Sequence, residues 1–200
     1  MELTRPETLP LALQTSCQRL SLLPDQRLFR RGDRAATIFV LVTGRIRCYR
    51  RTVEGREATL AVALSSQVLG EEALFSDRYL SSAIADTAAV LLAYPVEPLL
   101  GAIAQSPDLA TCLLSLMGQK VQTLQTLLEL RSIRSASLRV KQYLRYQAQD
   151  VQPIQIEGTW KTIAVELSLT PQTLSKALAQ LEENGQIDRT PKGIYLPERA

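Results

Sequence analysis

The chain has 200 residues, of which 46% are hydrophobic and 22% are charged, and its formal net charge is +3. This length allows one large domain or two small ones, and the composition is that of a folded globular protein rather than of a disordered chain. The chain contains no histidine, which excludes histidine-based catalysis and removes the most common ligand of metals and haem. Its three cysteines, Cys17, Cys48 and Cys112, are isolated from one another, so we expect neither haem nor an iron–sulfur cluster.

Targeting features are missing from the sequence. No apolar run approaches the ~20 residues that cross a bilayer, and the first ten residues lack the charged, apolar and small-residue regions of a secretion signal. We therefore expect a cytoplasmic chain that makes no contact with a membrane.

Short β-like runs separated by turn residues fill the first half of the chain. The expected strands are 28–29, 38–42, 45–51, 58–64, 82–86 and 88–94. The pair Glu54-Gly55 is typical of a hairpin turn, and apolar residues recur at period two in the strand that follows it. Several brief strands with turns between them favour an antiparallel sandwich or roll, whose interior has room for a small ligand.

A long helix is predicted from Pro107 to about Arg134, because Ser106, Pro107 and Asp108 supply a capping hydroxyl, an N1 proline and a first-turn acid. Apolar residues at alternating three- and four-residue steps mark one seam of this helix. The seam residues are Leu114, Met117, Val121, Leu124 and Leu128. The helix either packs on its own domain or pairs with a second copy. We favour a homodimer, since further leucines flank the seam.

Two short helices are predicted near the C-terminus, one capped by Thr159 and one capped by Thr170 with Pro171 at its first position. Two such helices joined by a tight turn form a helix-turn-helix, in which the small Ala164 lies where they cross. The start of the second helix then meets base edges in the major groove of double-stranded DNA. The residues expected to face bases are Gln172, Thr173, Ser175 and Lys176, and those expected to meet phosphates are Thr170 and Lys161, with Thr173.

A small hairpin or wing is predicted after the turn at Asn184-Gly185, over residues 186–195. The alternative for this region is a plain helical hairpin with a β tail. Residues 135–200 carry eight basic and seven acidic side chains, a net charge of +1. The attraction to phosphates is therefore modest for each chain, and two chains are needed.

The sequence thus predicts an α+β protein in three parts. Residues 1–106 form an antiparallel β-roll with an effector pocket, residues 107–134 form the long dimerisation helix, and residues 135–200 form a winged helix-turn-helix.

The order of these parts resembles the cyclic-AMP receptor protein / fumarate–nitrate regulator (Crp/Fnr) family of bacterial transcription regulators. Residues 30–33 (R-R-G-D) match the pattern R-x-G-D/E, residues 38–44 match a hydrophobic strand that ends in glycine, and residues 70–75 contain the G-E pair of a phosphate cassette. The resemblance implies a cupin-like jelly roll that binds an effector, a dimer helix that transmits the change, and recognition helices that enter a near-palindromic operator.

The resemblance is weaker in the sensor, where it implies a pocket at Gly70, Glu71, Ser81, Ser82, Leu124 and Gln125. Cyclic-nucleotide binders hold the phosphate with an arginine, whereas Ser81 stands at that position here. Arg78 is the alternative cation if the loop is drawn differently. Leu124 stands where the nucleotide binders have a small hydroxyl residue, and leucine forms no such hydrogen bond. We therefore expect no binding of cyclic AMP, and the effector, if one exists, is unidentified.

The recognition helix also departs from the family. Nucleotide-responsive members carry R-E-x-x-x-R, whereas this chain has Pro171, Gln172 and Lys176 at the specified positions. The E-x-x-S-R of the second subfamily is closer to the run Q-T-L-S-K at 172–176. Loss of the arginine fork predicts softer specificity.

One feature has no counterpart in the family: residues 25–57 contain nine arginines and four acidic residues, a net charge of +5. Its simplest interpretation is a solvated sheet face, and the alternatives are an acidic partner, such as another regulatory protein, or flanking DNA. RNA polymerase or another regulatory protein is a further candidate partner of the whole chain. For the whole chain, the leading hypothesis is a homodimeric DNA-binding regulator, and the alternative is a protein-interaction module with weak or no DNA binding. No nucleophile–base pair, paired-carboxylate motif or phosphate loop indicates an enzyme.

Overall fold

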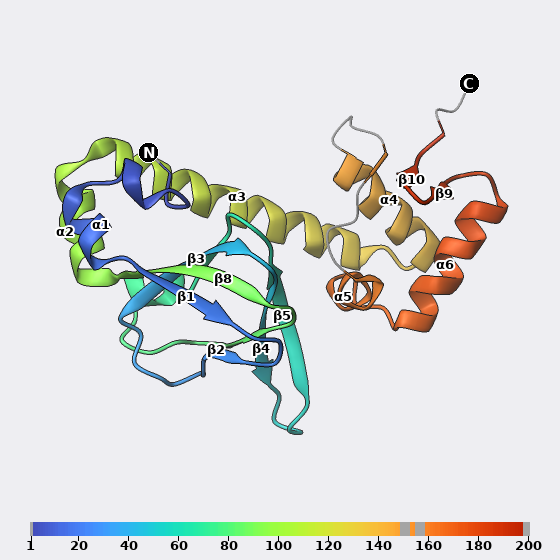
Figure 1. Cartoon of the computed structure of the whole chain (residues 1–200). Helices are drawn as coiled ribbons and strands as arrows, with labels where there is room; N and C mark the ends of the chain where they lie inside the picture. The colour runs from blue at the N-terminus through green and yellow to red at the C-terminus, as the bar shows by residue number, and fades with distance from the viewer. Residues whose placement is uncertain (1, 149–152, 155–158, 198–200) are drawn as a thin grey trace. The chain divides into compact units, whose positions relative to one another are not determined.

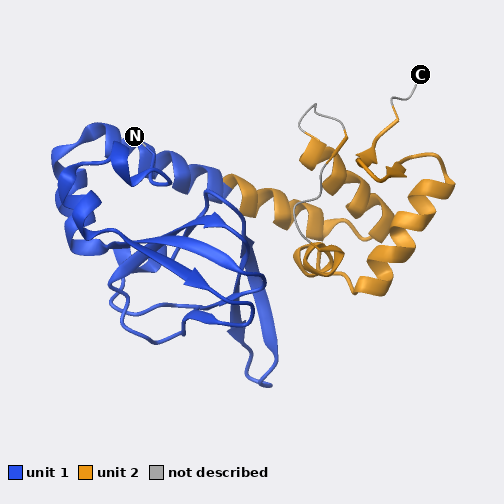
Figure 2. Ribbon diagram, in the orientation of Figure 1, with its two compact units in different colours: residues 1–121 blue, residues 122–200 orange. Residues whose placement is uncertain are grey.

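The structure is a computed structural model that describes residues 2–148, 153–154 and 159–197 (Figure 1). It divides into two compact units, residues 1–121 and 122–200, and the division falls inside the long helix α3 (Pro107–Ser132) rather than at either of its ends (Figure 2). The reason is packing: Leu109 and Leu113 at the start of α3 belong to the core of the first unit, whereas Leu130 at its end belongs to the core of the second.

The first unit begins with a 3-10 turn η1 (Pro6–Thr8) and a short helix α1 (Leu11–Ser16), which lies beside α2 (Val96–Gln105) (Figure 1). The buried hydroxyl of Tyr94 donates a hydrogen bond of 2.7 Å to the backbone oxygen of Leu3 and so fixes the N-terminal segment against the roll. The sequence did not predict these three elements.

Eight strands form two four-stranded antiparallel sheets, which confirms the predicted β-roll. The strands are β1 (Gln18–Leu22), β2 (Arg27–Phe29), β3 (Thr37–Thr43), β4 (Ile46–Arg51), β5 (Glu57–Ala63), β6 (Val68–Leu69), β7 (Ser82–Ala85) and β8 (Ala89–Pro95). One sheet has the order β1-β8-β3-β6 and the other has the order β2-β7-β4-β5. A short 3-10 helix, η2 (Glu71–Leu74), follows β6.

Both sheets contribute to one hydrophobic core. Ile38 and Leu91 from the first sheet and Ile46 and Ala83 from the second have no exposed surface and belong to the same cluster. The rings of Phe29 and Tyr79 stack with their centroids 4.0 Å apart, and both residues belong to this core. The compact apolar run at 38–42 therefore packs as the sequence predicts, in the centre of its sheet.

The turn between β3 and β4 requires glycine. Gly44 has a φ of +89°, and a Cβ atom there would lie 2.3 Å from the backbone oxygen of Ala88. This close approach holds the start of β4 against the loop before β8. The glycine that ends the hydrophobic strand in the family pattern, Gly44 in this chain, is thus required for a direct steric reason.

The second unit contains the end of α3, three further helices and two short strands in a winged helix-turn-helix order, and a separate core. Its elements are α4 (Ala136–Ala148), α5 (Trp160–Glu166), α6 (Pro171–Glu183), β9 (Asp188–Thr190) and β10 (Gly193–Tyr195). Ser135 caps α4, since its hydroxyl accepts a hydrogen bond from the Leu138 amide. No single helix in the described ranges is long and apolar enough to cross a membrane. Helices α2 and α3 are long and apolar enough only when they are taken together, and the chain bends by 120° between them.

Candidate nucleic-acid interface and effector pocket

The helix-turn-helix begins at two threonine caps. The hydroxyl of Thr159 accepts a hydrogen bond from the amide of Thr162 at the start of α5, and the hydroxyl of Thr170 accepts one of 3.1 Å from the amide of Thr173 at the start of α6. Pro171 occupies the first turn of α6, where its missing N–H is not needed. Both caps lie at the positions that the sequence predicts.

The crossing of the two helices is fully buried. Ala164 has no exposed surface, and its small side chain lets α5 and α6 approach. The anchors Ile163, Leu167, Leu174 and Leu178 are each at most 2% exposed. The angle between the helices is therefore fixed by packing.

The opposite face of α6 is exposed. Gln172, Ser175 and Lys176 lie on it, and Thr173 beside them is half-buried. The hydroxyls of Thr173 and Thr170 lie 2.8 Å apart and share a hydrogen bond. The two residues proposed for phosphates, Thr170 and Lys161, are also exposed, so every residue of the predicted DNA-facing set except the half-buried Thr173 is fully open at the surface.

A two-stranded wing follows α6. Strands β9 and β10 pair in an antiparallel register, with Ile194 opposite Arg189. The guanidinium of Arg189 forms an ion pair with Glu182 near the end of α6, which ties the wing to the recognition helix and lowers the pKa of the Glu182 carboxyl. The predicted hairpin therefore exists, although both of its strands are only three residues long.

The effector pocket expected from the family begins at Gly70, which has a φ of +71° and packs against the ring of Tyr79. The next residue, Glu71, pairs with the ammonium group of Lys120 from α3. Lys120 also donates a hydrogen bond of 3.0 Å to the backbone oxygen of Val68. A cation from the helix thus satisfies the carboxylate that, by the family resemblance, would meet a ribose.

The sequence did not predict Lys120 as a pocket residue. The pocket predicted from the family used residues near the cassette, where Ser81 replaces the arginine of the nucleotide binders, together with Leu124 and Gln125, whereas Lys120 lies 49 residues beyond Glu71. Its position on the same helix face as Leu113 and Met117, at three- and four-residue steps, is the signal that points it toward the roll.

Ser81, Ser82 and Arg78 have other partners. The hydroxyl of Ser81, which is 6% exposed, donates to a carboxylate oxygen of Glu72 at 3.2 Å. The hydroxyl of Ser82 accepts a hydrogen bond from the backbone amide of Arg31. Arg78 donates to the backbone oxygen of Gly32 at 2.7 Å and remains exposed. Leu124 and Gln125 are exposed and belong to the second unit, and their place in the pocket stays a prediction.

The buried and half-buried leucines of α3 pack against two different cores. Leu113 and Leu116 pack on the roll, and Leu127 and Leu130 pack on the helices of the second unit. Four residues of the predicted seam remain open, with Leu114 71%, Val121 54%, Leu124 38% and Leu128 66% exposed. Met117 is half-buried against the roll core and joins the seam only in part.

Comparisons with known proteins agree with this architecture. Residues 19–106 match the family model of the cyclic nucleotide-binding domain. The chain is 28% identical over 198 residues to the cyclic AMP receptor protein of Thermus thermophilus, covering 98% of this chain and 90% of that protein. The chain is therefore similar to a member of the Crp/Fnr family over nearly its whole length.

Two further proteins are similar to the chain over most of its length. The transcriptional activator protein anr of Pseudomonas aeruginosa is 25% identical over 176 residues, which cover 84% of this chain and 72% of that protein. Among solved structures, FixK2 from Bradyrhizobium japonicum superimposes with a TM-score of 0.74 at 21% identity and covers 92% of this chain and 93% of that chain. The FixK2 likeness shows that the fold is shared over most of the chain.

The three cysteines are free thiols, and no group of three or more acidic or cysteine side chains among the described residues is arranged to hold a metal ion. Burial raises the pKa of the Cys48 thiol to about 12, and Lys120, Glu71 and Glu72 are the charged groups that act on it. Cys48 therefore marks the inner, roll-facing side of β4.

Proposed function

We propose that this chain is a Crp/Fnr-type regulator, a homodimer that binds double-stranded DNA sequence-specifically, and that its effector pocket does not bind cyclic AMP. The observation that carries the proposal is the two-sided helix α6, whose inner face is buried around Leu174 and Leu178 while Gln172, Ser175 and Lys176 are exposed near its N-terminus. Side chains at the start of a recognition helix are the ones that reach base edges.

The exposed residues suit different contacts. Gln172 pairs bidentately with adenine, and Lys176 approaches a guanine edge as a point charge, each giving about 1–3 kcal/mol of discrimination. The hydroxyls of Thr170 and Thr173 and the ammonium of Lys161 suit phosphate oxygens, which position the domain without reading sequence. In this arrangement, residues 135–200 are the DNA-binding domain.

A dimer is supported by the open apolar seam of α3. Leu114, Val121, Leu124 and Leu128 follow steps of seven, three and four residues, which keep them on one side of the helix. A second copy laid on the seam would cover these side chains. It would also double the small positive charge of the DNA-binding domain and present two recognition helices, which bind half-sites ~34 Å apart. We therefore assign residues 107–134 to dimerisation and residues 1–106 to the effector domain.

The exclusion of cyclic AMP is supported by the contacts inside the roll. Lys120 already satisfies Glu71, and Ser81 already satisfies Glu72. A nucleotide phosphate would have to enter beside two carboxylates and break one of these contacts, without an arginine at position 81 to bind it. A different effector or none remains open, and RNA polymerase or another regulatory protein is a further candidate partner. DNA binding requires the cytoplasmic location that the sequence analysis expects.

Selection of bound sites from random duplexes, followed by gel retardation at low and high salt, tests the proposal. We expect a salt-sensitive shift that Lys176→Ala weakens about tenfold and that Lys176→Arg preserves or strengthens, since arginine binds guanine through two hydrogen bonds. Arg5→Ala is the matched control, because Arg5 is exposed in the first unit and pairs only with Glu2. No shift at low salt, or full affinity in Lys176→Ala, would instead favour the protein-interaction module.

A further inference from the structure

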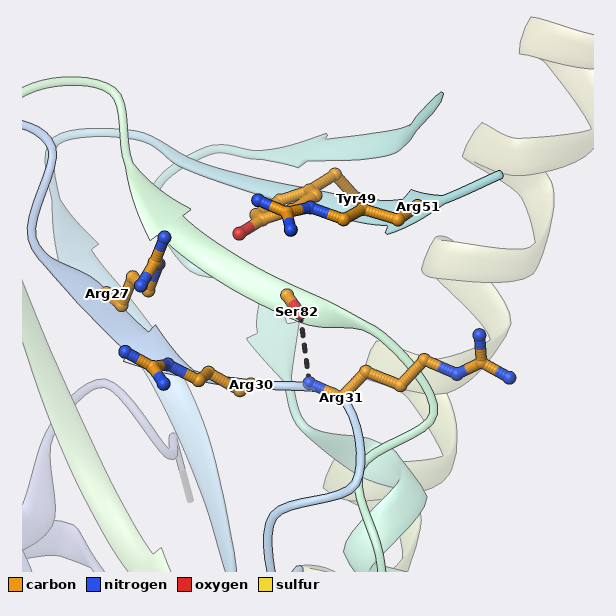
Figure 3. A pocket seen from close by; sticks show the side chains of 6 residues that line it. All are labelled: Arg27, Arg30, Arg31, Tyr49, Arg51 and Ser82. Carbon is orange, nitrogen blue, oxygen red and sulfur yellow. Dashed lines mark hydrogen bonds between the residues drawn. The ribbon is translucent and has the colours of Figure 1, made fainter. Parts of the chain in front are cut away.

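A cavity of about 320 Å³ opens on the sheet β2-β7-β4-β5, and arginines dominate its walls (Figure 3). It is lined by Arg27, Arg30, Arg31, Tyr49, Arg51 and Ser82. These residues come from the arginine-rich segment and from β7, and the proposed DNA contacts use none of them. The cavity therefore calls for an explanation of its own.

The register of the sheet places the cavity on the outer face of β4. Tyr49 pairs with Ser82, and the neighbouring Cys48 pairs with Ala83. Ala83 is fully buried in the roll core and Cys48 packs against that core. Because successive side chains point to opposite faces of a strand, Tyr49 and Ser82 face away from the core. The arginine cavity is thus separate from the pocket of Glu71 and Lys120, which lies on the inner face with Cys48.

The positive charge around the cavity is poorly compensated. In the part of the chain that the structure describes, Arg27, Arg30 and Arg31 form no ion pair, and Arg51 has only a long contact of 3.9 Å with Glu57. Glu57 also lies 3.5 Å from Arg47, on the same outer face. The nearby carboxylate of Asp33 accepts a hydrogen bond from the backbone amide of Arg30 rather than from a guanidinium. An anion in the cavity would relieve the repulsion among these like charges.

The donors surround one space. Figure 3 shows the guanidinium groups of Arg27, Arg30 and Arg51 on the same side of the cavity as the Tyr49 hydroxyl, while Arg31 extends its guanidinium away. The Arg31 backbone amide donates a hydrogen bond of 2.9 Å to the hydroxyl oxygen of Ser82. This leaves the hydroxyl proton of Ser82 available to a ligand. Three guanidinium groups and two hydroxyls, all donors, match the many acceptor oxygens of linked phosphates.

We propose that this cavity is a binding site for a small ligand that carries a chain of linked phosphates, such as the polyphosphate group of a nucleotide. The concave shape favours a compact anion over the backbone of a duplex, and its volume lies at the lower end of the range for small-molecule sites. The number of arginines favours several adjacent phosphates over one. The site is independent of the DNA contacts, so its test stands or falls separately from theirs.

Calorimetric titration of the full chain with inorganic triphosphate, at low salt, tests the site. We expect saturable binding to wild type, at least tenfold weaker binding of orthophosphate, and a loss of more than tenfold in affinity for triphosphate in Arg27→Gln/Arg30→Gln. Arg5→Gln/Arg56→Gln removes the same charge from exposed positions outside the cavity and should bind triphosphate like wild type.

Three results would overturn the proposal. The first is that wild-type protein does not bind triphosphate. The second is an equal loss of affinity in the two double variants, which would indicate diffuse charge only. The third is a cavity variant that still binds triphosphate but is no longer retained on duplex DNA, which would make the arginines a nucleic-acid surface. Circular dichroism melts of all variants establish that they are folded, and the substitutions lie at exposed side chains, where such changes are well tolerated.

Discussion

Lys120 of α3 and Glu71 of the phosphate cassette form an ion pair, and the same ammonium group donates a hydrogen bond to the backbone oxygen of Val68, the first residue of β6. The side chains are 25% and 27% exposed, so the contact is only partly screened by water. This pair attaches the middle of α3 to the cassette within the first unit. The Lys120–Glu71 pair therefore joins α3 to the cassette through side chains of the chain itself.

A double-mutant cycle measures this attachment. Lys120→Met should lower the free energy of unfolding by about 1 kcal/mol, because Glu71 and the Val68 carbonyl both lose a charged donor. Glu71→Gln should cost less, since a glutamine oxygen still accepts from Lys120. The double variant should be less destabilised than the sum of the single changes, as urea unfolding would measure. Additive effects would mean that the two groups do not interact in solution.

The same pair bears on the ligand. Wild-type protein titrated with cyclic AMP should release no heat, because the cassette carboxylates are already engaged. Micromolar binding would contradict this and would point to Arg78, which then would have to leave the Gly32 carbonyl that it now contacts.

The sequence predicts those parts of the fold that depend on local patterns. The apolar run at 38–42, the glycine turns at Gly44 and Gly55 and the threonine caps of α5 and α6 all lie where propensity and spacing put them. The two-residue strand β6 was not predicted, because it pairs only with β3 and owes its existence to that partner. Tertiary context, not local preference, decides such a short element.

The candidate site divides in the same way. Exposure of Gln172 and Lys176 follows from the helical period of α6, since the buried anchors Leu174 and Leu178 leave those positions on the other face. The contact between Lys120 and Glu71 does not follow from any period, because it joins segments 49 residues apart. The arginine cavity required the register of β4 on β7, which places Tyr49 opposite Ser82.

The open seam of α3 predicts the oligomeric state. In a dimer, a second copy would cover the exposed apolar side chains of the seam. Leu124→Glu would then bury a carboxylate between the two copies, and it should therefore convert the dimer into monomers. Gln122→Glu is the matched control, because Gln122 is exposed and lies about 100° round the helix from Val121. Light scattering coupled to gel filtration distinguishes the two states. An unchanged mass in Leu124→Glu, or a monomeric wild type, would contradict the role proposed for the seam.

The thiol of Cys48 reports on the inner pocket. Burial raises its pKa to about 12, so the thiolate fraction near pH 8 is about a thousandfold below that of an ordinary cysteine. In a Cys17→Ser/Cys112→Ser background, alkylation of the native protein should be slow and should rise about tenfold per pH unit from pH 7 to 10 without a plateau. The same protein unfolded in urea should react quickly and level off near pH 9. A native plateau near pH 9 would contradict the burial of this thiol.

The charged neighbours of Cys48 predict the direction in which the alkylation rate changes in two variants. Glu71 raises the pKa of the thiol and Lys120 lowers it, because a negative neighbour opposes the thiolate and a positive one favours it. Glu71→Gln should therefore speed native alkylation, and Lys120→Met should slow it. Mass spectrometry of the alkylated protein over time measures both rates. Faster alkylation in both variants would show that the substitutions open the pocket instead of changing its electrostatics, and equal rates in all three proteins would separate Cys48 from the Lys120–Glu71 pair.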